Sequence, residues 1–147
     1  MRSAAAWAGP LALLGACAPA AAGQAGFERL ADEYRRAHAA RDVDAVVALT
    51  HQPPGGTSLD TVREMAAVDV QQPVASVTLE PLAADERLEY TIRGVTYRPS
   101  ARPVGRMRVK LARPARLGDG FTTDSTSYLV GLVDGRYRLL GDAPVAR

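Results

Sequence analysis

The sequence of 147 residues has very few of the side chains that bind metals or form cross-links. It contains one cysteine, Cys17, so the chain cannot form an internal disulfide. Its two histidines, His38 and His51, stand thirteen positions apart, a spacing that resembles no metal site. We therefore expect neither a metal centre nor a disulfide-stabilised fold.

The chain also lacks asparagine, and Lys110 is its single lysine against 17 arginines. This skew is typical of a GC-rich genome, so the arginines are weak evidence for nucleic-acid binding. A Gly-x-Ser-x-Gly elbow, a phosphate-binding loop and a dinucleotide fingerprint are all missing. The sequence thus predicts no cofactor, no nucleic-acid partner and no established catalytic motif.

The N-terminal segment has the composition of an export signal. Met1–Ala16 starts with a charge at Arg2 and continues with an alanine- and leucine-rich stretch. With about 13 apolar residues it is shorter than the ~20 that a membrane-spanning helix needs. The segment ends in Leu14-Gly15-Ala16-Cys17, in which a branched residue and two small residues precede a thiol.

This pattern resembles the lipobox of bacterial lipoprotein precursors. The resemblance implies that residues 1–16 are a lipoprotein signal peptide and that Cys17 carries acyl chains such as palmitate. It further implies an exported protein, lipid-anchored to a bacterial membrane and facing the periplasm or the cell exterior. An ordinary signal peptide cleaved near Ala22, which would discard the cysteine, stays open as the alternative.

The two halves of the chain differ in charge. From Cys17 to Asp85 there are five basic residues against ten acidic ones, and from Glu86 onward twelve basic against six acidic. This asymmetry predicts an acidic helical layer that meets a basic sheet. A basic sheet face could also attract anionic lipid headgroups.

Residues 17–26 are rich in alanine and glycine and contain no large side chain, which predicts a flexible tether. A single domain should follow over residues 27–147. Phe27, Leu30 and Tyr34 recur at helical spacing, and Arg29 and Glu33 pair opposite charges four positions apart. The domain is therefore predicted to open with an amphipathic helix.

Two shorter helices are predicted next. Asp42 is a suitable N-cap for a helix over residues 43–50, which the run Pro53-Pro54-Gly55-Gly56 ends. Thr57 or Ser58 then caps a third helix that extends to about Val68.

After Pro73 the pattern changes to strands. Alternating apolar and polar side chains predict strands over residues 74–82, 87–98, 105–112, 122–133 and 136–141. Asp134-Gly135 is a two-residue hairpin signal between the last two. The predicted fold class is α+β, with three N-terminal helices packed on one face of an antiparallel sheet of four to six strands.

One segment resembles the opening of the ketosteroid-isomerase-like superfamily, also called nuclear transport factor 2-like. Tyr34 in a first helix is followed eight residues later by Asp42-Val43-Asp44 and a short helix that ends in Ala48-Leu49. The resemblance covers about 25 residues. It implies a curved, cone-like sheet that wraps around the helices and leaves a pocket, which the family uses for catalysis, binding and transport.

Within this resemblance, Tyr34 stands where the isomerases keep an oxyanion-hole tyrosine. Their chemistry also needs a carboxylate base beside the pocket, yet residues 51–57, which should bring it, hold no acid. We therefore predict no catalytic residue. His38 follows Tyr34 on the same helical stripe, where residues of both types are more often core or pocket-edge residues than catalysts.

The candidate pocket-lining residues come from the first helix and from the predicted strands. They are Leu30, Tyr34, His38, Tyr90, Met107 and Tyr128. The function favoured by these residues is a non-catalytic envelope lipoprotein that binds a small apolar ligand or a protein partner.

Two alternatives remain open. One is an isomerase, dehydratase or cyclase that uses Tyr34 and His38 in the cone pocket, and the other is a structural accessory subunit. A homodimer formed through the sheet face is a further expectation for the partners.

The lipid anchor can be tested directly. We expect Cys17→Ser to block maturation and to remove the protein from the detergent-soluble membrane fraction, because the thiol carries the lipid. Intact-mass analysis of the wild-type protein should find acyl chains on its N-terminus. A water-soluble native protein that begins after Ala22 would refute the prediction.

Overall fold

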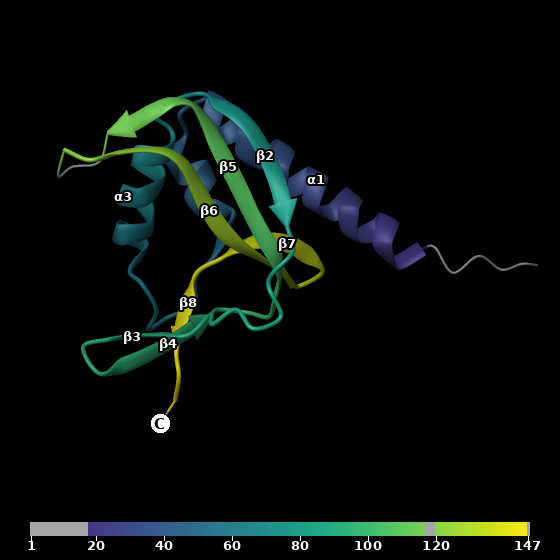
Figure 1. The fold of residues 1–147 in the computed structure, drawn as a ribbon, viewed down its shortest axis with the longest axis vertical. Helices are drawn as coiled ribbons and strands as arrows, with labels where there is room; N and C mark the ends of the chain where they lie inside the picture. Colours follow the sequence, from purple (N-terminus) through teal and green to yellow (C-terminus); the bar gives the residue numbers. More distant parts are fainter. Residues whose placement is uncertain (1–17, 117–119, 147) are drawn as a thin grey trace, which may run out of the picture.

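The computed structural model describes residues 18–116 and 120–146, and these form an α+β fold (Figure 1). Three helices pack against a five-stranded mixed sheet, and a separate three-stranded sheet lies at one end. Cys17 and the predicted signal peptide lie outside the described residues. Within the described part of the chain, no helix is long and apolar enough to cross a membrane.

Helix α1 spans Ala18–Ala39 and thus begins before Phe27. Residues 18–26, predicted as an unordered tether, are helical, because alanine is the strongest helix former and continues the helix towards the N-terminus. Gly26 permits close contact with the sheet, since a Cβ there would lie 2.5 Å from the ring of Tyr137. The boundary between tether and domain stays a prediction.

The second and third helices begin where the sequence predicts. Helix α2 spans Val43–Ala48, and its N-cap Asp42 accepts a hydrogen bond from the Ala45 amide at 2.9 Å. Helix α3 spans Leu59–Asp69 and is capped by Ser58. Both caps satisfy amide groups that have no partner inside the helix.

The large sheet has the strand order β1-β7-β6-β5-β2. Its strands are β1 (Thr50–His51), β2 (Val74–Glu80), β5 (Pro103–Arg116), β6 (Thr122–Val133) and β7 (Arg136–Leu140). The predicted β6–β7 turn is confirmed, with positive φ at Asp134 and Gly135.

The prediction of a purely antiparallel sheet is wrong at one edge. Thr50 and His51 leave helix α2 and pair parallel with Leu139 and Leu140, so the sheet is mixed. The amide of Leu139 donates to the carbonyl of Leu49 at 3.0 Å, which continues this ladder. A strand of two residues has too little alternation to be recognised in a sequence.

The predicted single strand over residues 87–98 is a hairpin instead. Strand β3 (Tyr90–Ile92) turns at Arg93-Gly94 into β4 (Val95–Pro99), which pairs with β8 (Asp142–Pro144). Arg93 and Gly94 both have positive φ, at 50° and 78°. Arginine is uncommon at the first of these positions, so the turn lacks the usual Asn-Gly or Asp-Gly signal.

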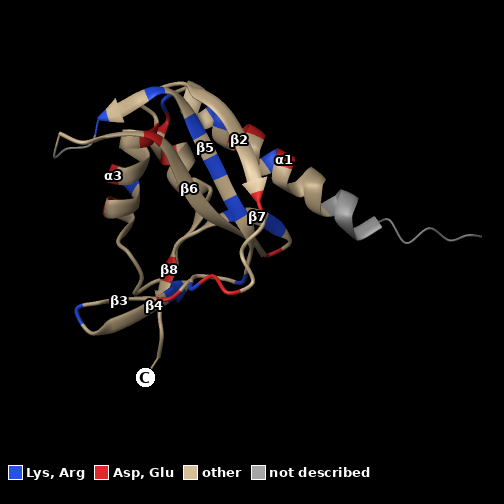
Figure 2. Ribbon diagram, viewed as in Figure 1, with Lys and Arg blue, Asp and Glu red and all other residues tan. Residues whose placement is uncertain are grey.

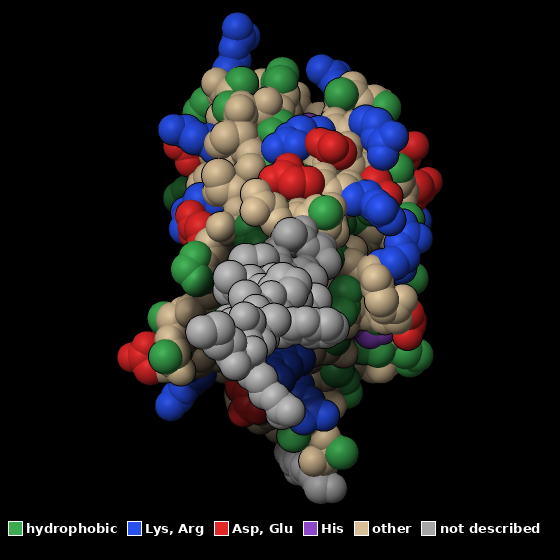
Figure 3. All heavy atoms as spheres, turned by 90° about the vertical axis from the view of Figure 1, so that its right-hand side faces the viewer, with side chains coloured by type: hydrophobic (Ala, Val, Ile, Leu, Met, Phe, Trp, Pro, Cys, Tyr) green, Lys and Arg blue, Asp and Glu red, His purple; other side chains and the backbone are tan. Residues whose placement is uncertain are grey.

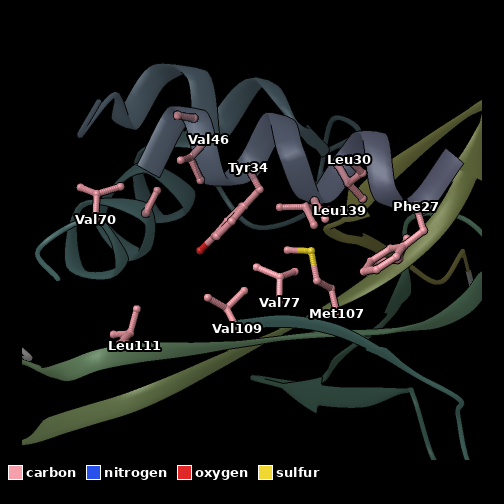
Figure 4. Close-up of a cluster of buried hydrophobic side chains, with 14 of the residues drawn as sticks. Phe27, Leu30, Tyr34, Val46, Val70, Val77, Met107, Val109, Leu111 and Leu139 are labelled. Atoms are coloured by element: carbon pink, nitrogen blue, oxygen red, sulfur yellow. The ribbon is translucent and has the colours of Figure 1, made fainter. Parts of the chain in front are cut away.

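The core lies between α1 and the large sheet (Figure 4). Leu30 and Tyr34 of α1 meet Met107 and Val109 of β5 and Leu139 of β7, and all five are at most 2 % exposed. Met107 and Val109 alternate with charged residues along β5, which places one face of the strand on the helix. This contact positions α1 on the large sheet.

The charge asymmetry of the sequence is partly visible on the sheet. Figure 2 shows Lys and Arg along β5, where Arg106, Arg108 and Lys110 share the face opposite the core. Arg108 pairs with Glu80 at 2.7 Å, and Arg106 pairs with Glu86. Figure 3 likewise shows acidic and basic side chains close together, with hydrophobic side chains scattered between them.

Candidate functional site

A cavity of about 330 Å³ lies between helices α2 and α3 and the strands that face them. Its walls come from the two helices, from β1 and the loop that follows it, from β3 and the segment before it, from β4, β6 and β7, and from the start of β8. The lining residues are Val46, Thr50, Gln52, Thr57, Val62, Met65, Ala66, Leu88, Tyr90, Pro99, Ser127, Tyr128, Leu129, Leu140, Gly141 and Asp142.

Most of the cavity wall is apolar. Val62, Met65 and Ala66 lie three and four positions apart on α3 and so share one side of that helix. Leu129 and Leu140 contribute from β6 and β7. This wall suits the burial of a hydrocarbon surface.

One end of the cavity is polar and is centred on Asp142. The Asp142 Oδ1 atom accepts hydrogen bonds from the Thr57 amide at 2.5 Å and from Gln52 Nε2 at 3.3 Å. The Oδ2 atom accepts from Thr57 Oγ1 at 2.6 Å and from the Tyr90 hydroxyl. Four donors thus surround a carboxylate that is 8 % exposed.

Glycines allow these segments to approach so closely. A Cβ on Gly141 would lie 1.7 Å from Gln52 Oε1, and one on Gly56 would lie 2.1 Å from the Asp142 carbonyl oxygen. Gln52 also donates to that carbonyl at 3.0 Å and accepts from the Asp142 amide at 3.3 Å. The Pro-Pro-Gly-Gly run, which lies between β1 and α3, therefore helps to build this site.

The hydrogen bonds determine the charge of the site. Burial alone would raise the pKa of Asp142, but the hydrogen bonds from Thr57, Tyr90 and Gln52 outweigh it, so the pKa lies below its ordinary value. Burial, the hydrogen bond to Asp142 and its negative charge raise the pKa of Tyr90 to about 12. At neutral pH the pair is a carboxylate and a neutral phenol.

A second polar cluster lies behind the cavity wall. The Tyr128 hydroxyl donates to the carboxylate of Asp69, the last residue of α3. The Tyr34 ring lies 5.4 Å from the His38 ring and 5.9 Å from the Tyr128 ring, centroid to centroid. Asp69, Tyr34 and His38 are each at most 5 % exposed, and of the four only Tyr128 lines the cavity.

Burial controls the protonation of this cluster. It raises the pKa of Asp69 to about 6, against the opposing hydrogen bond from Tyr128. It also lowers the pKa of His38, and burial together with the nearby Asp69 raises the pKa of Tyr34.

The predicted site residues fall into two groups. Tyr90 and Tyr128 line the cavity. Leu30, Tyr34 and Met107 lie in the core between helix and sheet, and His38 is buried beside Tyr34. The structure thus brings Tyr34, His38 and Tyr128 together. Tyr128 also shares the cavity wall with Tyr90.

The sequence analysis missed both buried acids. Asp69 follows Val62 by seven positions and Ala66 by three, so the helical pattern could have placed it on the buried side of α3. It supplies a carboxylate near Tyr34, which residues 51–57 lack. Asp142 had no such signal, because its donors stand 52, 85 and 90 positions away in the chain.

The described residues contain no metal-binding cluster. Nowhere among them do three or more His, Cys, Asp or Glu side chains form a group that could hold a metal ion.

No protein-family model matches the chain, and a search of curated proteins finds no significant match.

The raised pKa of Asp69 predicts a pH-dependent stability. A pKa of about 6 in the folded chain, against an ordinary 3.8, means that folding favours the protonated acid. The contribution of Asp69 to the free energy of unfolding is therefore fully present below about pH 4 and is lost as the pH rises through about 6. His38, whose pKa is lowered, acts in the opposite direction.

Urea unfolding of the wild type and of Asp69→Asn between about pH 4 and pH 8 isolates the acid, because His38 contributes equally to both proteins. We expect the wild type to lose on the order of 2 kcal/mol relative to the variant over this range. Parallel stability curves for the two proteins would show that folding does not raise the pKa of Asp69.

Proposed function

We propose that this protein is a non-catalytic, membrane-anchored envelope lipoprotein that binds a small apolar ligand in the cavity beside α3. The observation that carries the proposal is the cavity itself, an apolar space with one polar end. Small-molecule sites are typically concave and largely apolar, with a few polar groups that orient the ligand. The volume of about 330 Å³ suits a ligand of modest size.

We further propose that the fold belongs to the ketosteroid-isomerase-like superfamily and that its sheet forms the cone characteristic of that family. The order of three helices followed by antiparallel strands is compatible with this assignment. In such a fold the pocket is part of the architecture, which supports its use for binding. The lipid on Cys17, directly before α1, would hold the domain at the membrane surface.

Two observations favour binding over catalysis. A general base needs a free lone pair and a pKa near the working pH, whereas Asp142 accepts four hydrogen bonds and has a lowered pKa. The cluster of Asp69, Tyr34 and His38 contains an acid with a suitable pKa, but none of these three side chains lines the cavity.

The second candidate function is an isomerase, dehydratase or cyclase. Asp69 favours it, because it places a carboxylate with a pKa of about 6 near Tyr34. Such an enzyme would require Tyr128 to move so that a substrate could reach Asp69. Turnover of an enone by the protein, abolished in Asp69→Asn without any fall in melting temperature, would support this candidate.

Ligand binding is tested by thermal shift with a panel of small apolar compounds. We expect at least one compound to raise the melting temperature of the full chain, because a ligand at 100 times its Kd stabilises by about 2.7 kcal/mol. Val62→Trp should abolish the shift by filling the cavity, since Val62 lines it.

Glu64→Trp is the matched control, because Glu64 is exposed on the same helix and does not line the cavity. It should keep the ligand response of the wild type. Shifts of equal size in both tryptophan variants would place the ligand elsewhere, and the absence of any shift in the wild type would contradict the proposed function.

A further inference from the structure

Asp142 is the only charged side chain among the residues that line the cavity. Within the described parts of the chain, no lysine, arginine or histidine side chain lies within 4.0 Å of its carboxylate. Burial of an ion without a counter-ion is unfavourable, which is why buried charges are usually paired. The cavity therefore contains a full negative charge that the protein itself does not neutralise.

The hydrogen bonds of Asp142 satisfy its lone pairs but leave its charge in place. A carboxylate has about four acceptor sites, and the Thr57 amide, Thr57 Oγ1, Gln52 Nε2 and the Tyr90 hydroxyl occupy four. All four donors are neutral groups. A ligand that carries N–H donors would thus find no vacant acceptor on Asp142, although a positive charge would still be attracted to it.

Aromatic rings lie in the same cavity. Tyr90 and Tyr128 both line it, and the Tyr90 hydroxyl contacts Asp142 directly. Tyr90 is further positioned by its stacking on Tyr97, with ring centroids 5.4 Å apart. Faces of tyrosine rings attract cations, and quaternary ammonium groups are the ligands that use this interaction most.

We propose that the cavity binds a quaternary ammonium compound with an apolar chain, its cationic head next to Asp142 and Tyr90 and its chain against α3. This inference rests on the proposed function of the cavity and names the chemical class of its ligand. A quaternary ammonium has no N–H group to satisfy, so it matches a carboxylate whose acceptor sites are all in use. An anionic head would be repelled by Asp142, and a neutral head would leave the buried charge uncompensated.

Three probes with the same eight-carbon chain test the charge of the head. They are octyltrimethylammonium, 1-octanol and octanoate, titrated into the full chain by calorimetry below their micelle concentrations. We expect the cation to bind roughly tenfold more tightly than the alcohol, since the cation–π and Coulomb terms add to the same chain burial. Octanoate should bind more weakly than the alcohol.

Two variants assign the preference to Asp142. Asp142→Asn should abolish the preference for the cation while 1-octanol still binds. Asp134→Asn is the matched control, because it removes an equal charge at the exposed β6–β7 turn and should keep the preference. Tyr90→Phe removes one hydrogen bond to Asp142 but keeps both the aromatic ring and the carboxylate, so it should also keep the preference for the cation. It therefore separates the loss of the charge from the loss of a hydrogen bond that helps to hold the site together.

The outcomes separate this inference from the proposed function. The inference is overturned if the alcohol binds the wild type as tightly as the cation does. It is also overturned if Asp142→Asn prefers the cation over the alcohol as strongly as Tyr90→Phe does, because the charge of Asp142 then does not select the ligand. If none of the three probes binds and the thermal-shift panel also fails, the cavity is not a ligand site and both proposals fall.

Discussion

The hydrogen bonds of the Asp142 carboxylate are the interaction on which the candidate site depends. They join the loop after β1, through Gln52 and Thr57, to Tyr90 of β3 and to the start of β8. The large sheet and its helices meet the small sheet at this point. These bonds therefore close the polar end of the cavity.

Asp69 and Asp142 illustrate how donors decide the charge of a buried acid. Burial raises the pKa in both cases, but Asp69 receives the hydrogen bond of Tyr128 and ends at about 6, whereas Asp142 receives four hydrogen bonds and ends below its ordinary value. The two acids therefore divide the interior into a region that can take up a proton and one that stays negative. Only the second region borders the cavity.

Much of the fold could be predicted because its periodic elements are long. The helical caps Asp42 and Ser58, strand β6 and the Asp134-Gly135 turn follow from local patterns. The Arg93-Gly94 hairpin and the parallel strand β1 were missed, since a short strand has little pattern and its pairing is set by tertiary contacts. The same reason hid Asp142, whereas Tyr90 and Tyr128, which line the cavity, were among the pocket candidates named from the sequence.

At neutral pH a buried, ionised carboxylate forms the polar end of the cavity. Carbon-13 NMR of the aspartate side chains, recorded as a pH titration of the full chain without any ligand, measures its protonation. We expect the Asp142 carboxyl resonance to be that of the ionised form at neutral pH and to titrate with a midpoint below the 3.8 of an ordinary aspartate. A midpoint above 3.8 would show instead that burial outweighs the hydrogen bonds, so that they do not hold the carboxylate in its ionised form.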